Sequence, residues 1–102
     1  MIFDWDDDKR EKTLRERGID FIDAAMVWSD PMRQERLDLG REYGEKRIQT
    51  IGAVSFGILL VVYTERVQED GQEIVRIISV RKASRKERQE YETRTFHARK
   101  II

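Results

Sequence analysis

The fold of this chain is decided by two apolar stretches, Gly57-Ile58-Leu59-Leu60-Val61-Val62-Tyr63-Thr64-Glu65-Arg66 and Ile74-Val75-Arg76-Ile77-Ile78-Ser79-Val80-Arg81-Lys82. Both are rich in β-branched residues and too short for typical helices, so each predicts a β-strand. The polar connection between them contains Asp70-Gly71, a dipeptide typical of hairpin turns. We therefore expect the two stretches to form the central strands of a single sheet.

The other segments predict a strand at residues 1–5, helices at 8–17 and 20–30, a short edge strand within 32–44, a strand at 46–54 and a last helix at 85–96. The helix ends are marked by Asp8 with Glu11, by Gly18, by Asp20, by Asp30-Pro31, and by Ser84 with Glu87. Short turns between neighbouring strands favour antiparallel pairing. The expected fold is α+β, an antiparallel meander sheet with two N-terminal helices and one C-terminal helix, in one domain spanning residues 1–102.

Strict alternation along the second central strand separates its two inner arginines. It places Arg81 on the face of Val75 and Ile77, and Arg76 on the opposite face with Ile78 and Val80. Uniting Arg76 and Arg81 in one site would require a β-bulge or a site at the end of the sheet. We also expect Ile78 to be deeply buried.

Composition narrows the class of protein. Charged residues make up 39% of the chain, its net charge is zero, and it has no cysteine, which excludes disulfides and thiolate metal sites. Charge is uneven: residues 1–30 carry a net −4, residues 31–75 a net −2 and residues 76–102 a net +6. The absence of a leading signal segment and of a long apolar run predicts a soluble cytoplasmic protein without membrane contact.

The chemistry-bearing residues are arginines and glutamates near the ends of the central strands. The sequence has no phosphate-binding glycine loop and no metal-spaced cluster, so we expect neither cofactor nor metal. Arginine holds phosphate through paired hydrogen bonds but is a poor proton shuttle. A general base would have to be a carboxylate such as Glu65 or Glu45, or a lysine of lowered pKa. Two alternatives stay open. The arginines and glutamates form surface ion pairs, as in a non-catalytic basic protein-interaction module, and the single His97 is a solvent-exposed residue rather than a catalytic one.

Several motifs follow one another in order over about residues 3–92. They are Phe3-Asp4-Trp5-Asp6, Leu14-Arg15-Glu16-Arg17-Gly18-Ile19-Asp20-Phe21, Ala24-Ala25, Asp30-Pro31, Gly44-Glu45-Lys46-Arg47, Tyr63-Thr64-Glu65-Arg66 and the block from Arg76 to Arg88. Together they resemble the BrnT toxin family. The resemblance implies a RelE-like fold and a type II toxin–antitoxin endoribonuclease that inhibits translation. Family members commonly have Lys-His-Gly where this chain has Glu16-Arg17-Gly18.

The resemblance also suggests which side chains act. The family's charged positions fall on Glu45, Arg47, Glu65, Arg66, Arg76 and Arg81. From their chemistry we assign catalysis to Glu45, Glu65, Arg76 and Arg81, and RNA binding to Arg17, Arg47, Arg66, Lys82, Arg85 and Arg88. Arg17 stands at the position of the family histidine, where it can bind phosphate but is a poor proton donor.

The partners implied by the resemblance are RNA and a BrnA-like antitoxin in a hetero-oligomer, with operator DNA reached only through the antitoxin. We expect the antitoxin to cover the basic region Arg81–Arg88. Exposed charge pairs contribute little, so tight binding requires apolar contacts as well. Trp5, Tyr91 and Phe96 are the aromatic candidates, with core packing as the alternative role.

Overall fold

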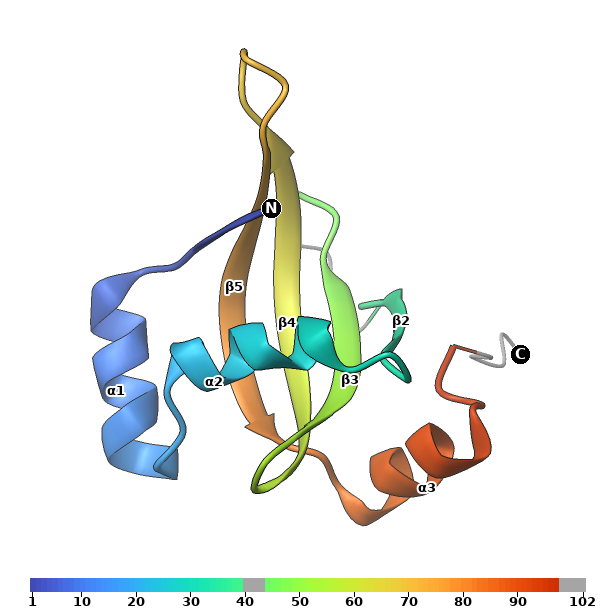
Figure 1. Cartoon of the computed structure of the whole chain (residues 1–102). Coiled ribbons are helices and arrows are strands. Elements are labelled where there is room, and N and C mark those ends of the chain that lie inside the picture. The colour runs from blue at the N-terminus through green and yellow to red at the C-terminus, as the bar shows by residue number, and fades with distance from the viewer. Residues whose placement is uncertain (40–43, 98–102) are drawn as a thin grey trace.

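The computed structural model describes residues 1–39 and 44–97 as a five-stranded sheet with helices on both sides (Figure 1). The elements are β1 (Ile2–Asp4), α1 (Asp7–Arg17), α2 (Phe21–Ala25), the 3-10 helix η1 (Met26–Ser29), β2 (Gln34–Leu37), β3 (Ile48–Val54), β4 (Gly57–Val67), β5 (Glu73–Lys82) and α3 (Arg85–Thr93). The predicted α+β class is confirmed. Part of the predicted segment 32–44 lies outside the described residues.

The sheet is mixed, with strand order β1-β5-β4-β3-β2. The predicted meander is present, because β2, β3, β4 and β5 pair antiparallel in sequence order. A purely antiparallel sheet was the wrong expectation, because β1 pairs parallel to β5. The chain leaves β1 through α1 and α2 rather than through a tight turn, so nothing constrains this pair to be antiparallel.

The predicted hairpin between β4 and β5 is confirmed. Gly71 adopts φ +84°, a conformation that favours glycine. The turn is closed by a hydrogen bond of 2.9 Å from the Gln68 N–H to the Gln72 carbonyl. The hairpin tip extends well beyond the rest of the sheet (Figure 1).

A β-bulge in β5 overturns the predicted strand faces. Val62 pairs with Ser79 while Tyr63 pairs with Ile77, so Ile78 is an extra residue. The bulge shifts the alternation, and Val80 joins Val75 and Ile77 in one hydrophobic core. Ile78 is only partly buried, so the expected deep burial was wrong.

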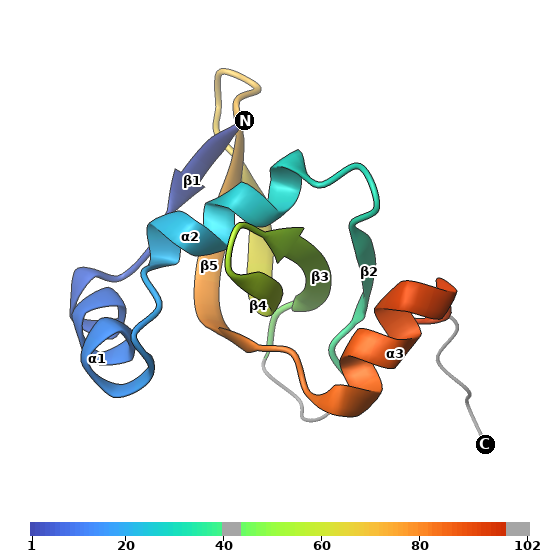
Figure 2. The same ribbon diagram turned by 60° about the horizontal axis from the view of Figure 1, so that its bottom comes forward.

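The two faces of the sheet are covered differently (Figure 2). The α2 face, named for the helix that crosses it, carries the larger core, with Phe21, Val27 and Leu59 fully buried. The opposite face carries a smaller core under α3, built from Ile51, Leu60, Ala83 and Phe96. Trp5 and Tyr91 pack against these two cores, and Phe96 is fully buried, which favours the packing role for the aromatic candidates.

Local sequence accounts for most helix ends. Gly18 ends α1 in the left-handed conformation, and α2 and α3 begin with the capping boxes Asp20/Asp23 and Ser84/Glu87. The first helix begins at Asp7, one residue earlier than predicted, because the Asp6 side chain rather than that of Asp8 accepts the capping hydrogen bonds. In the described part of the chain, no helix combines the length and apolarity that crossing a membrane requires.

Candidate nucleic-acid interface

The bulge at Ile78 places both inner arginines of β5 on the face opposite α2. Arg81 pairs with Leu60 and Arg76 with Thr64, two positions of β4 that share this face. We call this surface the open face; its members beyond the α3 core are Arg47, Gln49, Val62, Thr64, Arg76, Ser79 and Arg81. A β-bulge was one of the two conditions under which Arg76 and Arg81 could share a site, and β5 contains one.

Arg76 is held at the β1 edge of the open face. Its Nη1 donates to Asp4 Oδ2 at 2.5 Å, and 29% of its side chain stays exposed to solvent. Asp4 is the residue of β1 that pairs with Arg76, so the two strands position the ion pair. Such a half-exposed guanidinium is oriented by its partner and still accessible to an anion.

Thr64 lies between the arginines of β3 and β5 on the open face. Thr64 pairs with Arg76 of β5. On the β3 side, Ile48 pairs with Tyr63, so extending this register by one residue brings Arg47 opposite Thr64. Thr64 is only 3% exposed, and its hydroxyl has no hydrogen-bond partner within the described ranges. A buried hydroxyl without a hydrogen-bond partner is unusual in folded proteins.

Arg81 is tied to the start of α3. Its Nη1 and Nη2 donate to the two carboxylate oxygens of Glu87 at 2.7 and 2.9 Å. Burial opposes ionisation of Glu87, yet the hydrogen bonds from Arg81 and the Ser84 N–H lower its pKa to about 2. The same pair raises the pKa of Arg81. Arg81 therefore keeps its charge, and 44% of its side chain remains exposed.

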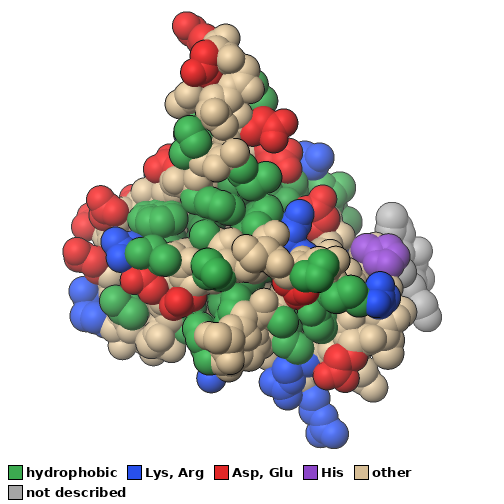
Figure 3. Space-filling view, viewed as in Figure 1, with side chains coloured by type: hydrophobic (Ala, Val, Ile, Leu, Met, Phe, Trp, Pro, Cys, Tyr) green, Lys and Arg blue, Asp and Glu red, His purple; other side chains and the backbone are tan. Residues whose placement is uncertain are grey.

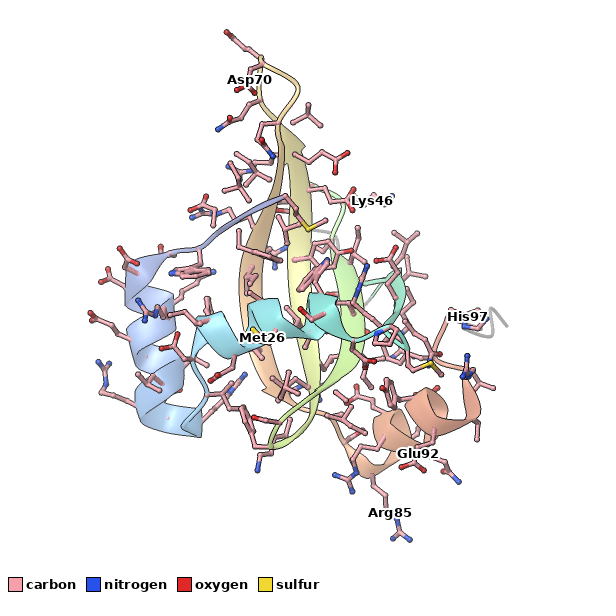
Figure 4. The ribbon with its side chains drawn as sticks, viewed as in Figure 1. Met26, Lys46, Asp70, Arg85, Glu92 and His97 are labelled. Atoms are coloured by element: carbon pink, nitrogen blue, oxygen red, sulfur yellow. The ribbon has the colours of Figure 1, made fainter. Side chains whose placement is uncertain are left out.

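Further basic side chains gather where β5 meets α3. Arg17 donates to the Val80 carbonyl at 2.8 Å, which brings the end of α1 to the edge of β5. Lys82, Arg85 and Arg88 follow, and Figure 4 shows Arg85 at the outer end of α3. A surface hollow of about 470 Å³ is lined by Arg85, Arg88, Gln89 and Glu92. We call Arg17, Lys82, Arg85 and Arg88 the basic corner.

The predicted carboxylates are not gathered with these arginines. Glu65 alternates with Thr64 and lies toward the α2 face, where it lines a cavity of about 200 Å³ with Trp28 and Tyr63. Glu45 is exposed in a bend before β3, at the end of the sheet near Lys46 (Figure 4). Arg66 follows Thr64 by two positions, toward the hairpin. The structure thus places Arg47, Arg76 and Arg81 on one face of the sheet and Glu65 on the other.

A second polar network escaped sequence analysis. Tyr63 donates to Glu35 at 2.6 Å, and Arg33 donates to both Glu35 and Thr50 at 3.1 Å. Burial favours the neutral form of Glu35, but these hydrogen bonds lower its pKa, while burial and Glu35 raise that of Tyr63. Glu35 lies in a polar stretch without an apolar pattern, so no sequence signal pointed to it.

Sequence alone also did not predict the contacts that Asp4, Thr64 and Glu87 make with residues of the open face. Glu87 was expected only as a helix cap, and Asp4 and Thr64 acquire their neighbours through strand pairing. His97 is exposed beyond α3 (Figure 4). Within the described ranges, no three carboxylate or histidine side chains are grouped to hold a metal ion.

Comparison with known proteins gives the chain its family. The family model described as "Ribonuclease toxin, BrnT, of type II toxin-antitoxin system" matches residues 5–87, which include α1, the whole sheet except β1 and the start of α3. No curated protein matches the sequence. Because the match covers most of the chain, this protein belongs to the BrnT family of type II toxin–antitoxin ribonuclease toxins.

Proposed function

We propose that this chain is an endoribonuclease that inhibits translation and cleaves RNA on the open face, in a RelE-like fold and without a metal ion. The observation that supports this site is the bulge at Ile78, which brings Arg76 and Arg81 to the same face as Arg47. Three guanidinium groups on one face suit the closely spaced phosphates of RNA. Lys82, Arg85 and Arg88 of the basic corner are exposed and follow Arg81 in sequence, where β5 leads into α3.

The reaction follows from the chemistry of RNA. The 2′-hydroxyl gives up its proton and attacks the adjacent phosphorus, and the bond from phosphorus to the 5′-oxygen breaks. The departing oxygen takes a proton from water, so that a 2′,3′-cyclic phosphate and a 5′-hydroxyl form. Arg76 and Arg81 stabilise the negative charge that develops on the phosphoryl oxygens. Because the nucleophile belongs to the substrate, the mechanism needs no metal-activated water.

A carboxylate is needed to take the proton from the 2′-hydroxyl. Glu65 lies toward the α2 face, away from the arginines of the open face. Glu45 is exposed in the bend before β3 and precedes Arg47 by only two residues. We therefore favour Glu45 over Glu65 as the general base, with Arg17, Arg47, Arg66, Lys82, Arg85 and Arg88 as RNA-binding residues.

Regulation by a protein partner follows from family membership, because a type II toxin has an antitoxin. We propose a BrnA-like antitoxin that covers Arg81–Arg88, blocks RNA and carries any contact with operator DNA. Arg85 and Arg88 are exposed at the start of α3, where a partner can reach them.

RNA cleavage by the purified chain, assayed with and without a metal chelator, tests the proposed function. We expect cleavage that the chelator does not change, and losses on the order of 10²–10³-fold in Arg76→Ala and Arg81→Ala. Arg15→Ala, an exposed arginine of α1, is the matched control and should cleave at the wild-type rate. Absence of cleavage by the wild type, or full activity in both β5 variants, would contradict the proposal.

The alternative of a non-catalytic basic interaction module has one observation in its favour. Arg76 and Arg81 each already bind a carboxylate, Asp4 and Glu87, so both have a structural role. Expression of the chain without its antitoxin separates the two functions. Growth arrest with RNA loss supports the ribonuclease, whereas normal growth and intact RNA favour the module.

A further inference from the structure

A groove runs between η1 and the turn that joins β3 to β4. Its volume is about 390 Å³, and its lining includes Met26, Pro31, Val54 and Phe56. Its floor is closely packed because Val27 lies directly against β3. A Cβ added to Gly52 would come within 2.6 Å of Val27 Cγ1. The groove is therefore a fixed feature between two packed elements.

Large apolar side chains line this groove and remain exposed. Met26 is 55% exposed and Phe56 is 46% exposed, and Ile22, which lies outside the lining, is 50% exposed. Ile22 and Met26 are four residues apart along α2 and η1, so they lie on one side of the helical segment. Figure 3 shows hydrophobic side chains over this region, and Figure 4 places Met26 on the surface toward the viewer. Contiguous exposed apolar surface of this kind marks an interaction site.

The groove is joined to α3 by Asp30. Asp30 Oδ2 accepts hydrogen bonds from the Ala53 N–H at 2.7 Å and from the Tyr91 hydroxyl at 2.5 Å. Burial opposes its ionisation, but these hydrogen bonds lower the pKa of Asp30, while burial and then the contact with Asp30 raise the pKa of Tyr91 to about 12. The wall of the groove and the helix that carries Arg85 and Arg88 thus form one connected surface.

Charge differs between the two ends of this surface. Asp23 lines the groove at its α2 end, within the acidic N-terminal third of the chain. Past Tyr91 toward the start of α3, the exposed charges are Arg85, Lys86 and Arg88, all of them basic. A complementary ligand would have apolar side chains at its centre, a basic residue at the α2 end and carboxylates at the α3 end.

We propose that this groove is the apolar anchor site for the antitoxin, a statement that rests on the proposed toxin function. One segment of the antitoxin places apolar side chains between Met26 and Phe56 and continues with carboxylates over Arg85 and Arg88. Exposed ion pairs alone contribute little to affinity, so the groove supplies the apolar burial that the basic corner lacks. The acidic end of the groove disfavours RNA as its occupant.

Binding titrations with the purified antitoxin encoded beside this chain test the proposal. We expect Met26→Glu and Phe56→Glu each to weaken the dissociation constant by about tenfold or more, with unchanged RNA cleavage by the unbound variants. Val67→Glu, which introduces the same charge at an exposed apolar residue beside the hairpin, is the control and should bind like the wild type. Arg85→Ala/Arg88→Ala should reduce the salt dependence of binding while keeping the effect of Met26→Glu. Thermal unfolding of each variant checks that it is folded.

The outcomes separate this proposal from the ribonuclease function. Weakened binding in the groove variants supports the anchor site even if the chain proves inactive on RNA. Wild-type affinity in folded Met26→Glu and Phe56→Glu overturns it, even if RNA cleavage is confirmed. Failure of the antitoxin to bind the wild type overturns it as well. Weaker RNA binding in the groove variants would assign the groove to RNA instead.

Discussion

Glu87 connects the end of β5 with the start of α3. Its carboxylate accepts two hydrogen bonds from Arg81 and one from the Ser84 N–H at 2.8 Å. The same residue thus caps a helix and orients an arginine that we assign to catalysis. Loss of its charge should affect both stability and the position of Arg81.

We expect Glu87→Gln to lower the free energy of unfolding at pH 7 by about 1–2 kcal/mol, through a weaker helix cap and the lost ion pair. The pKa of Glu87 is lowered to about 2 in the folded chain. A lowered pKa stabilises the folded state above the unfolded pKa, and this contribution is lost as pH falls. The difference between wild type and variant should therefore shrink between about pH 5 and pH 2.

Urea unfolding across this pH range measures the effect, with Glu92→Gln as the control because Glu92 is exposed on the same helix. Equal unfolding curves for the wild type and Glu87→Gln at every pH would contradict the role given to this carboxylate.

Residue-level features were predicted where they depend on near neighbours in sequence. The capping box of Ser84 and Glu87 and the αL conformation of Gly18 follow from a few adjacent residues, and both were read correctly. The buried hydroxyl of Thr64 was not, because its surroundings come from β3 and β5. Short sequence patterns thus predict local structure, whereas contacts across a sheet depend on the strand register.

At the scale of the element, the bulge in β5 determines which residues share a face. It leaves Ile77 buried at 1% exposure and Ile78 only partly buried. The sequence Ile77-Ile78-Ser79 contains no glycine or proline to announce the irregularity. The apolar pattern therefore located the strand but assigned Val80 and Arg81 to the wrong faces.

The two neighbouring isoleucines give a matched test of the bulge. We expect Ile77→Ala to lower the free energy of unfolding by about 2–5 kcal/mol, since it leaves a cavity in the core. Ile78→Ala should cost clearly less, because less of that side chain is removed from water. Denaturant unfolding measures both. Equal losses, or a larger loss in Ile78→Ala, would mean that the bulge is misplaced.

At the scale of the whole molecule, the sheet separates two surfaces with different chemistry. The open face carries arginines from β3 and β5, while the α2 face is covered by helices and bordered by an apolar groove. Acidic side chains gather at the hairpin tip and basic ones beside the start of α3, while α1 carries charges of both signs (Figure 3). We assign RNA to the first surface and the anchor of the antitoxin to the second.

The overall architecture was largely predictable because the meander follows the order of the chain. The parallel pairing of β1 was not, since it joins Ile2–Asp4 to a strand about 70 residues away in sequence. The same long-range pairing supplies Asp4 as the partner of Arg76. The arginines of the candidate site were proposed from the sequence, whereas the face that they share depends on the fold.

The central claim is that RNA binds the open face, and an NMR titration of the labelled chain with a short 2′-O-methyl RNA tests it most directly. This RNA keeps its phosphates but lacks the attacking hydroxyl, so the complex persists. The account predicts the largest amide shifts at Arg47, Thr64, Arg76 and Ser79, with little change along α2. The largest shifts along α2 and around Met26, with the open face unchanged, would contradict it.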